Sequence, residues 1–104
     1  MITSNLGQYL RKLRKAKKET LHQVSKEVDI DSPMISKIER GERLPTFDQI
    51  RRFSQYFGVS EVSLKEMRIA EKILKEYGFN DTTYNAIQIV NRQLTTHFNE
   101  NKQL

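Results

Sequence analysis

Residues 20–41 constrain the fold more than any other segment, because they read as two short helices joined by a tight turn. Apolar residues recur at helical spacing on both sides of the turn, so each predicted helix has one face for a core. These residues are Leu21, Val24 and Val28 before the turn, Ile30 within it, and Ile35 and Ile38 after it. Thr20 can cap the first helix, and Asp31 or Ser32 the second. Gly41 supplies the left-handed conformation that ends the second helix.

The second of these helices has a largely polar outward face. When Ile35 and Ile38 point into the core, four residues face outward, namely Ser32, Pro33, Ser36 and Lys37. Asp29 lies where the chain must turn between the helices, and aspartate adopts left-handed conformations more readily than most residues. A short helix that rests on another and presents such a face fits the major groove of DNA.

A series of motifs surrounds this segment. In order, they are Leu6-Gly7, Leu10-Arg11-x-Leu13-Arg14, Thr20, Val24-Ser25, Ile30, Ile35-Ser36-x-Ile38-Glu39-x-Gly41, Pro45 and Gly58-Val59-Ser60. Through them, residues 6–64 resemble a DNA-binding domain of the Xre/Cro type, the family that includes the lambdoid phage repressors. Leu21 departs from the pattern where many members carry a phosphate-contacting glutamine, and Asp29 replaces the usual turn glycine.

The resemblance implies an all-α fold, with a five-helix lambda-repressor-like DNA-binding domain whose last helix is extended and followed by one further C-terminal helix. It also implies roles for individual residues. The base-contacting candidates are Ser32, Pro33, Met34, Ser36 and Lys37, although Met34 can equally pack beneath its helix. The phosphate-contacting candidates are Thr20, Leu21 through its backbone N–H, Gln23, Arg40 and Arg43. Arg14 and Glu39 are expected to form a structural ion pair.

The net charge of +5 is concentrated in the part of the chain that bears the motif. Residues 1–58 hold 12 Lys or Arg against 7 Asp or Glu, whereas residues 59–104 hold six of each. A concentrated positive face favours binding to a polyanion through counterion release. Arg11, Lys15 and Lys18 are expected to be solvated or near phosphates, and His22 is a surface residue that can lie near a phosphate.

Composition argues against catalysis, and we predict no enzyme activity, no metal site and no cofactor. The chain has no cysteine, its two histidines are far apart as His22 and His97, and no glycine-rich phosphate loop exists among its four glycines. No secretory leader and no long apolar run is present in the sequence, so we expect a soluble cytoplasmic protein without a membrane partner.

Beyond the motif, we predict a DNA-binding domain over residues 1–62, with the helix-turn-helix at 20–39, and a C-terminal helical hairpin over 63–104. Capping boxes are possible at Thr46 with Gln49 and at Ser63 with Glu66, and Asn80 or Asp81 can cap the last helix. The last helix carries an apolar stripe, namely Tyr84, Ile87, Val90, Leu94 and Phe98. The hairpin must pack on its own domain, on a second copy or on another protein; we favour a homodimer.

These expectations lead to a function. We expect a bacterial or phage transcription regulator that binds double-stranded DNA sequence-specifically through the major groove. It should act as a homodimeric repressor on a two-fold operator and associate with the nucleoid when bound. An antitoxin or a restriction-system controller with the same domain is an alternative. A protein-bridging module that does not read DNA is another, because fold alone does not fix function.

Overall fold

The computed structural model describes residues 5–102, and all regular secondary structure within them is helical. The expected all-α, lambda-repressor-like class is confirmed. The helices are α1 (Asn5–Ala16), α2 (Leu21–Val28), α3 (Ser32–Glu39), α4 (Phe47–Phe57), α5 (Glu61–Tyr77) and α6 (Asp81–Lys102).

Local capping determines where the helices of the motif begin. The Thr20 hydroxyl accepts a hydrogen bond from the Gln23 N–H, and the Gln23 side chain accepts one from the Thr20 N–H, which completes a capping box on α2. Asp31, one of the two residues expected as the cap of α3, accepts from the Met34 N–H at 2.8 Å. Thr46 and Gln49 form the expected capping box at the start of α4.

One predicted cap is wrong. Ser63 and Glu66 do not begin a helix, because α5 already starts at Glu61. The Ser60 hydroxyl accepts a hydrogen bond from the Ser63 N–H at 3.1 Å, so the residue that closes the preceding turn also caps α5. Ser60 lies three residues before Ser63, the serine that the sequence pattern had indicated.

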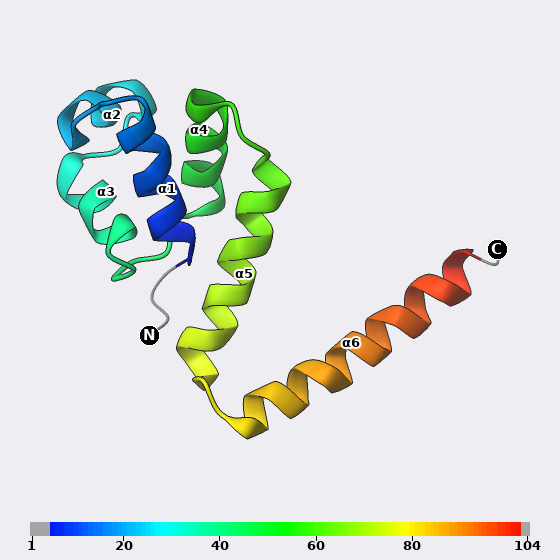
Figure 1. The fold of residues 1–104 in the computed structure, drawn as a ribbon. Helices are drawn as coiled ribbons and strands as arrows, with labels where there is room; N and C mark the ends of the chain where they lie inside the picture. The colour runs from blue at the N-terminus through cyan, green and yellow to red at the C-terminus, as the bar shows by residue number, and fades with distance from the viewer. Residues whose placement is uncertain (1–4, 103–104) are drawn as a thin grey trace. The chain divides into compact units, whose positions relative to one another are not determined.

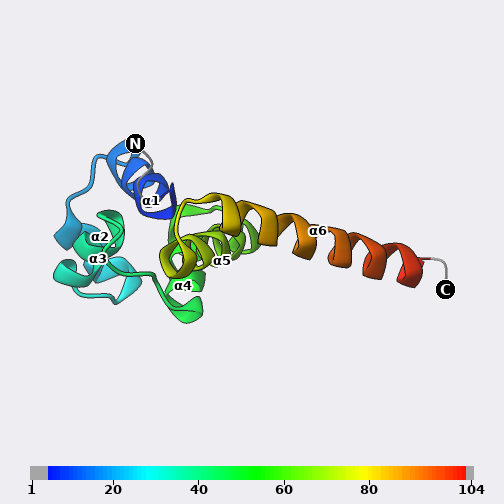
Figure 2. The same cartoon turned by 90° about the horizontal axis from the view of Figure 1, so that it is seen from below.

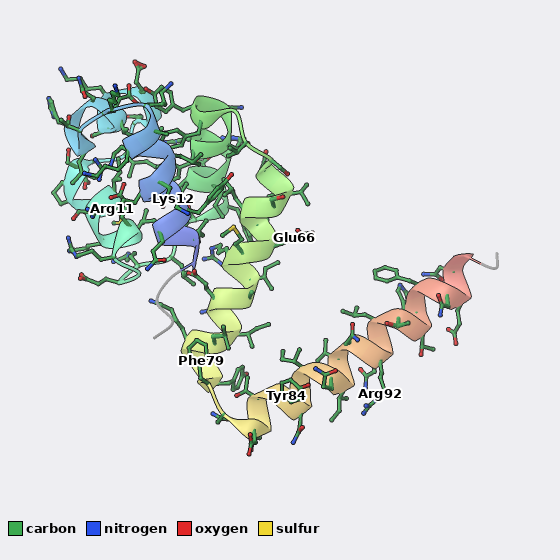
Figure 3. All side chains as sticks on the ribbon, viewed as in Figure 1. Arg11, Lys12, Glu66, Phe79, Tyr84 and Arg92 are labelled. Atoms are coloured by element: carbon green, nitrogen blue, oxygen red, sulfur yellow. The ribbon has the colours of Figure 1, made fainter. Side chains whose placement is uncertain are left out.

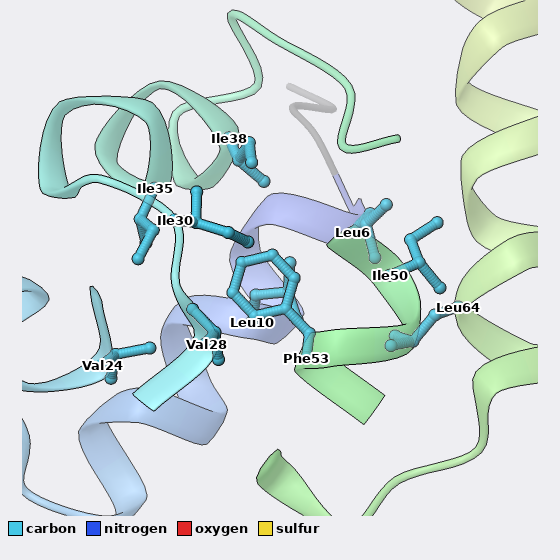
Figure 4. Close-up of a cluster of buried hydrophobic side chains, with 10 residues drawn as sticks. All are labelled: Leu6, Leu10, Val24, Val28, Ile30, Ile35, Ile38, Ile50, Phe53 and Leu64. Atoms are coloured by element: carbon cyan, nitrogen blue, oxygen red, sulfur yellow. The ribbon is translucent and has the colours of Figure 1, made fainter. Parts of the chain in front are cut away.

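Figures 1 and 2 show how α1 to α4 and the first part of α5 are arranged, and Figure 4 shows the single apolar core that holds them together. The buried side chains of this core are Leu6, Leu10, Val24, Val28, Ile30, Ile35, Ile38, Ile50, Phe53 and Leu64. Each of α1 to α4 contributes two of these residues at helical spacing, whereas α5 contributes Leu64 alone.

α5 extends this first compact unit beyond Leu64. The Glu71 carboxylate, almost fully buried, accepts a hydrogen bond from the Leu6 N–H at 2.7 Å, so it serves the first turn of α1, where backbone N–H groups have no partner within the helix. The chain divides into two compact units between Lys72 and Ile73, whereas the sequence pattern placed the boundary at residue 62.

The second unit comprises the last turn of α5, a short turn and α6. Gly78 takes a left-handed conformation at φ 87°, which ends α5. Asn80 accepts a hydrogen bond from the Thr83 N–H and caps α6, and the buried Thr83 hydroxyl donates to the Tyr77 carbonyl at 3.1 Å. Among the described helices, none combines the length and the apolar character that crossing a bilayer requires.

Candidate nucleic-acid interface

The turn between α2 and α3 fixes the angle at which α3 is presented. Asp29 adopts the left-handed conformation, with φ 56° and ψ 49°, and its N–H donates to the Ser25 carbonyl at 3.0 Å. Arg52 on α4 donates to the Asp29 carbonyl at 2.9 Å and forms an ion pair with Asp48. The turn is therefore held both by its own backbone and by a guanidinium that reaches it from α4.

The far end of α3 is fixed by a buried ion pair. Arg14 on α1 donates through Nε to Glu39 Oε2 at 2.8 Å and through Nη2 to Glu39 Oε1 at 2.9 Å, the two-point geometry that makes such pairs strong. Its Nη1 donates to the Glu19 carbonyl at 3.0 Å. The hydrogen bonds to Glu39 raise the pKa of Arg14, against the effect of burial. Both side chains thus join α3 to α1 and are not available to DNA.

The outward face of α3 carries the residues that the sequence proposed as base readers. Pro33 and Lys37 are exposed, and Ser32 and Ser36 are half-buried. Met34 is partly buried against the hydrophobic core, so the structure places it beneath α3. Lys37 is the one cation among the four residues of this face. Its charge also helps to lower the pKa of nearby Glu42.

The two arginines after α3 differ in their surroundings. Arg40 forms a two-point ion pair with Glu42, at 2.7 and 3.2 Å, and donates a further hydrogen bond to the Ser36 hydroxyl. The hydrogen bond between them raises the pKa of Arg40 and lowers that of Glu42. Arg43 is exposed and has no ion pair among residues 5–102. A phosphate would have to replace Glu42 at Arg40, whereas Arg43 can bind one without losing a partner.

An open cleft of about 650 Å³ lies at the start of α2. Its lining residues are Arg14, Lys15, Lys18, Glu19, Thr20, Leu21, His22 and Ser32. It brings two predicted phosphate contacts, Thr20 and Leu21, together with the base-reading candidate Ser32. The first N–H groups of a helix attract anions, and α2 has no acidic residue in its first turn. Lys15 and Lys18 outweigh Glu19, whose carboxylate accepts a hydrogen bond from Tyr56, so the cleft suits a phosphate.

The side chain of Gln23, which we predicted to contact a phosphate, also has a structural role in the described structure. Its amide oxygen accepts from the Thr20 N–H at 2.8 Å and thereby shapes the start of α2. The amide nitrogen remains on an exposed residue and can still donate. Gln23 therefore orders the first turn of α2, and any contact that it makes with a phosphate comes from the amide nitrogen.

Sequence reasoning assigned no role to Tyr56. Its hydroxyl donates to Glu19 Oε2 at 2.5 Å, which ties the segment between α1 and α2 to α4. Lys17 lies over the Tyr56 ring, with Nζ 4.7 Å from its centre. The hydrogen bond to Glu19 is the main cause that raises the pKa of Tyr56 to about 12. Because Glu19 and Tyr56 are 37 residues apart, no local pattern could have paired them.

Comparisons with known proteins agree with this geometry. No curated protein gave a significant match to the chain. The family model described as Helix-turn-helix matches residues 10–64, more than half of the chain, and spans the segment from Leu10 in α1 to Leu64 in α5. The chain therefore belongs to the Xre/lambda repressor-like helix-turn-helix family of DNA-binding transcription regulators.

Proposed function

We propose that the protein is a homodimeric repressor that binds a two-fold operator with α3 of each copy in the major groove. One observation carries the proposal: the exposed Lys37 on the outer face of α3 accompanies a basic cleft at the start of α2. Helix-turn-helix proteins use these two places for base edges and for phosphates. Such a regulator would work in the cytoplasm, on the nucleoid.

Within this proposal, Lys37 is the principal base reader. Its ammonium can donate to the O6 and N7 atoms of guanine, a contact worth about 1–3 kcal/mol of discrimination against other bases. Ser32 and Ser36 discriminate weakly because a hydroxyl both donates and accepts. Pro33 offers apolar contact to a thymine methyl group. Met34, which packs against the core, contributes to the shape of this face.

Phosphate contacts orient the protein without reading sequence. We assign them to the start of α2, through Thr20, the Leu21 N–H and the Gln23 amide nitrogen, and to the loop after α3, through Arg43 and Arg40. Because Arg40 already pairs with Glu42, Arg43 should contribute more of the salt dependence. Few polar side chains face the bases, so operator choice should also depend on DNA shape and on the spacing of the half-sites.

Selection of bound duplexes from a random pool would give the operator, and variants would then separate the two kinds of contact. We expect Lys37→Ala to weaken binding to the selected site by about 1–3 kcal/mol and binding to random DNA much less. Arg43→Ala should weaken both and lower the slope of log K against log salt by roughly one. Arg92→Ala removes one positive charge from α6 and should change neither, which makes it the matched control.

The binding measurements distinguish a base-reading repressor from the alternatives. Equal losses on selected and random DNA for Lys37→Ala would remove its assignment as a base reader. Failure of the wild-type protein to bind any duplex at moderate salt would favour the protein-bridging alternative. A palindromic consensus with two chains bound supports the two-fold operator. An antitoxin or a restriction-system controller would give the same DNA result, and genomic neighbours would distinguish these from a repressor.

A further inference from the structure

α6 is poor in charge and rich in exposed apolar side chains. Between Asp81 and Glu100, the only charged residue is Arg92, in a chain that is 30% Asp, Glu, Lys and Arg. Tyr84 is 65% exposed, Leu94 49% and Phe98 55%. Side chains along α6, Tyr84 and Arg92 among them, project from the helix in Figure 3. A solvated helix face normally carries charge, and depletion of charge marks the centre of an interface.

Most of these apolar residues lie on one face, which we call the α6 seam. Its residues alternate at three and four positions, and they are Tyr84, Ile87, Asn91, Leu94 and Phe98. This spacing is that of helices that pack along their length. Asn91 lies at the middle, seven residues from Tyr84 and seven from Phe98, or roughly 10 Å along the helix in each direction. An asparagine in such a position commonly sets the register of two paired helices.

The seam borders a groove of about 500 Å³ within the second unit. Its walls come from the end of α5, the turn and the start of α6, namely Ile73, Tyr77, Asn80, Thr82, Thr83, Ala86, Ile87 and Val90. Ile87 belongs to both the groove and the seam. The same surface therefore has a concave part at the start of α6 and projecting side chains, Leu94 and Phe98, toward its end.

We propose that the α6 seam is the surface through which two copies of this chain associate, antiparallel and about a two-fold axis at Asn91. A two-fold interface must be complementary to itself, and a surface with both a groove and projecting side chains meets that condition. In this arrangement Phe98 of each copy enters the groove of the other, and Leu94 packs near Ile87 of the other copy. The inference rests on the homodimer in the proposed function and identifies its surface.

A second copy fits this surface better than a small apolar ligand. A ligand in the groove would leave Leu94 and Phe98 exposed, whereas a partner helix covers the groove and the seam together. Residues 73–104 hold three basic and three acidic residues, so two copies do not repel each other through net charge. Tyr77, Tyr84 and Phe98 are each more than half exposed, and covering them would bury about 100 Å² each. Ile87, Val90 and Leu94 are each more than a third exposed and add further apolar area, which brings the surface toward the roughly 600 Å² per partner at which specific interfaces begin.

Two isomeric side chains provide a matched pair of variants. Leu94 and Ile89 are 49% and 48% exposed, but five residues of helix separate them, which places Ile89 off the seam. In sedimentation equilibrium of the full chain, we expect wild type and Ile89→Arg to form dimers. Leu94→Arg should dimerise only at a concentration at least tenfold higher. A monomeric wild type at all concentrations, or equal dimerisation of the two arginine variants, would overturn the proposal.

Introduced cysteines test the register directly, because the chain has no cysteine of its own. Asn91→Cys should form a disulfide between copies under mild oxidation, since both thiols lie at the axis. Thr96→Cys, on the opposite side of α6, should cross-link much more slowly. Equal rates would overturn the antiparallel arrangement, and this assay stays informative if Leu94→Arg does not fold.

DNA assays distinguish failure of this inference from failure of the proposed function. Cross-linking through Asn91→Cys with no duplex bound would leave the α6 dimer in place and reject the DNA role. Two chains on a palindromic site without Asn91→Cys cross-linking would reject the α6 seam and keep the DNA role. If both hold, Leu94→Arg should bind a single half-site as wild type does and lose affinity mainly for the two-fold site.

Discussion

Removing one partner of the Arg14–Glu39 ion pair tests how α3 is held in place. Glu39→Met replaces a buried carboxylate with an apolar side chain of similar length and leaves the Arg14 guanidinium without its main acceptor. The two side chains are only 8% and 5% exposed, so water cannot readily replace the lost hydrogen bonds. An uncompensated buried charge of this kind costs about 3–5 kcal/mol. Because small domains are stable by about 5–15 kcal/mol, this is a large share of the total.

The double variant Arg14→Met with Glu39→Met separates the cost of a stranded charge from the value of the pair. Apolar residues in place of a complete buried ion pair are often neutral or stabilising. Besides the ion pair, the double variant loses only the hydrogen bond from Arg14 to the Glu19 carbonyl. A hydrogen bond from a charged group of this kind contributes about 1.5–3 kcal/mol to stability. In urea unfolding of wild type, Glu39→Met and the double variant, Glu39→Met should therefore be the least stable. The double variant should recover part or all of the lost stability.

The exposed pair of Arg40 and Glu42 supplies the control. Its side chains are 51% and 54% exposed and water can replace the lost partner, so Glu42→Met should destabilise the protein far less than Glu39→Met does. A loss below about 1 kcal/mol for Glu39→Met would refute the reasoning, since it would mean that Arg14 finds water or another acceptor. A double variant as unstable as Glu39→Met would refute it in another way, because the loss would then come from packing and not from charge.

Two further predictions concern the same domain. Gly7→Ala should destabilise the domain by about 1–3 kcal/mol in urea unfolding, because an added Cβ would lie 2.4 Å from the Ile38 carbonyl oxygen. Alanine is otherwise favoured over glycine within a helix by up to about 1 kcal/mol. A gain in stability would therefore contradict the close approach of α1 to Ile38. The pKa of Tyr56 is raised to about 12 from 10, so its hydrogen bond stabilises the fold fully below about pH 10 and is lost as pH rises toward 12. Urea midpoints should fall over that range more steeply for wild type than for Tyr56→Phe, and parallel curves would contradict the bond.

Local signals explain why much of the fold could be predicted. The helices of the motif begin at caps that bond to a neighbour three residues on, so Thr20 and Thr46 were identifiable from the sequence. The turn at Asp29 could also be predicted from the sequence, since its left-handed conformation depends on the residue itself. Apolar spacing gave the inward faces of α2 and α3.

Contacts between distant residues could not be predicted in this way. Glu71 bonds to the Leu6 N–H across 65 residues, and Arg52 reaches the Asp29 carbonyl across 23. Glu71 did leave a trace, because it lies seven residues after the buried Leu64 and therefore on the same face of α5. A charged residue on an inward stripe implies a buried partner, but its sequence neighbours do not reveal which one.

The contacts that hold α3 in place come from α1 and α4, on the sides of the helix that point away from its proposed DNA face. Arg14 and Gly7 on α1 fix the end of α3, and Arg52 on α4 fixes the turn before it. Lys37, by contrast, is exposed. Substitutions on the outward face should therefore change DNA preference at little cost in stability, whereas changes at Arg14 or Gly7 should weaken DNA binding and folding together. A Lys37 variant that lost operator binding only through unfolding would break this separation.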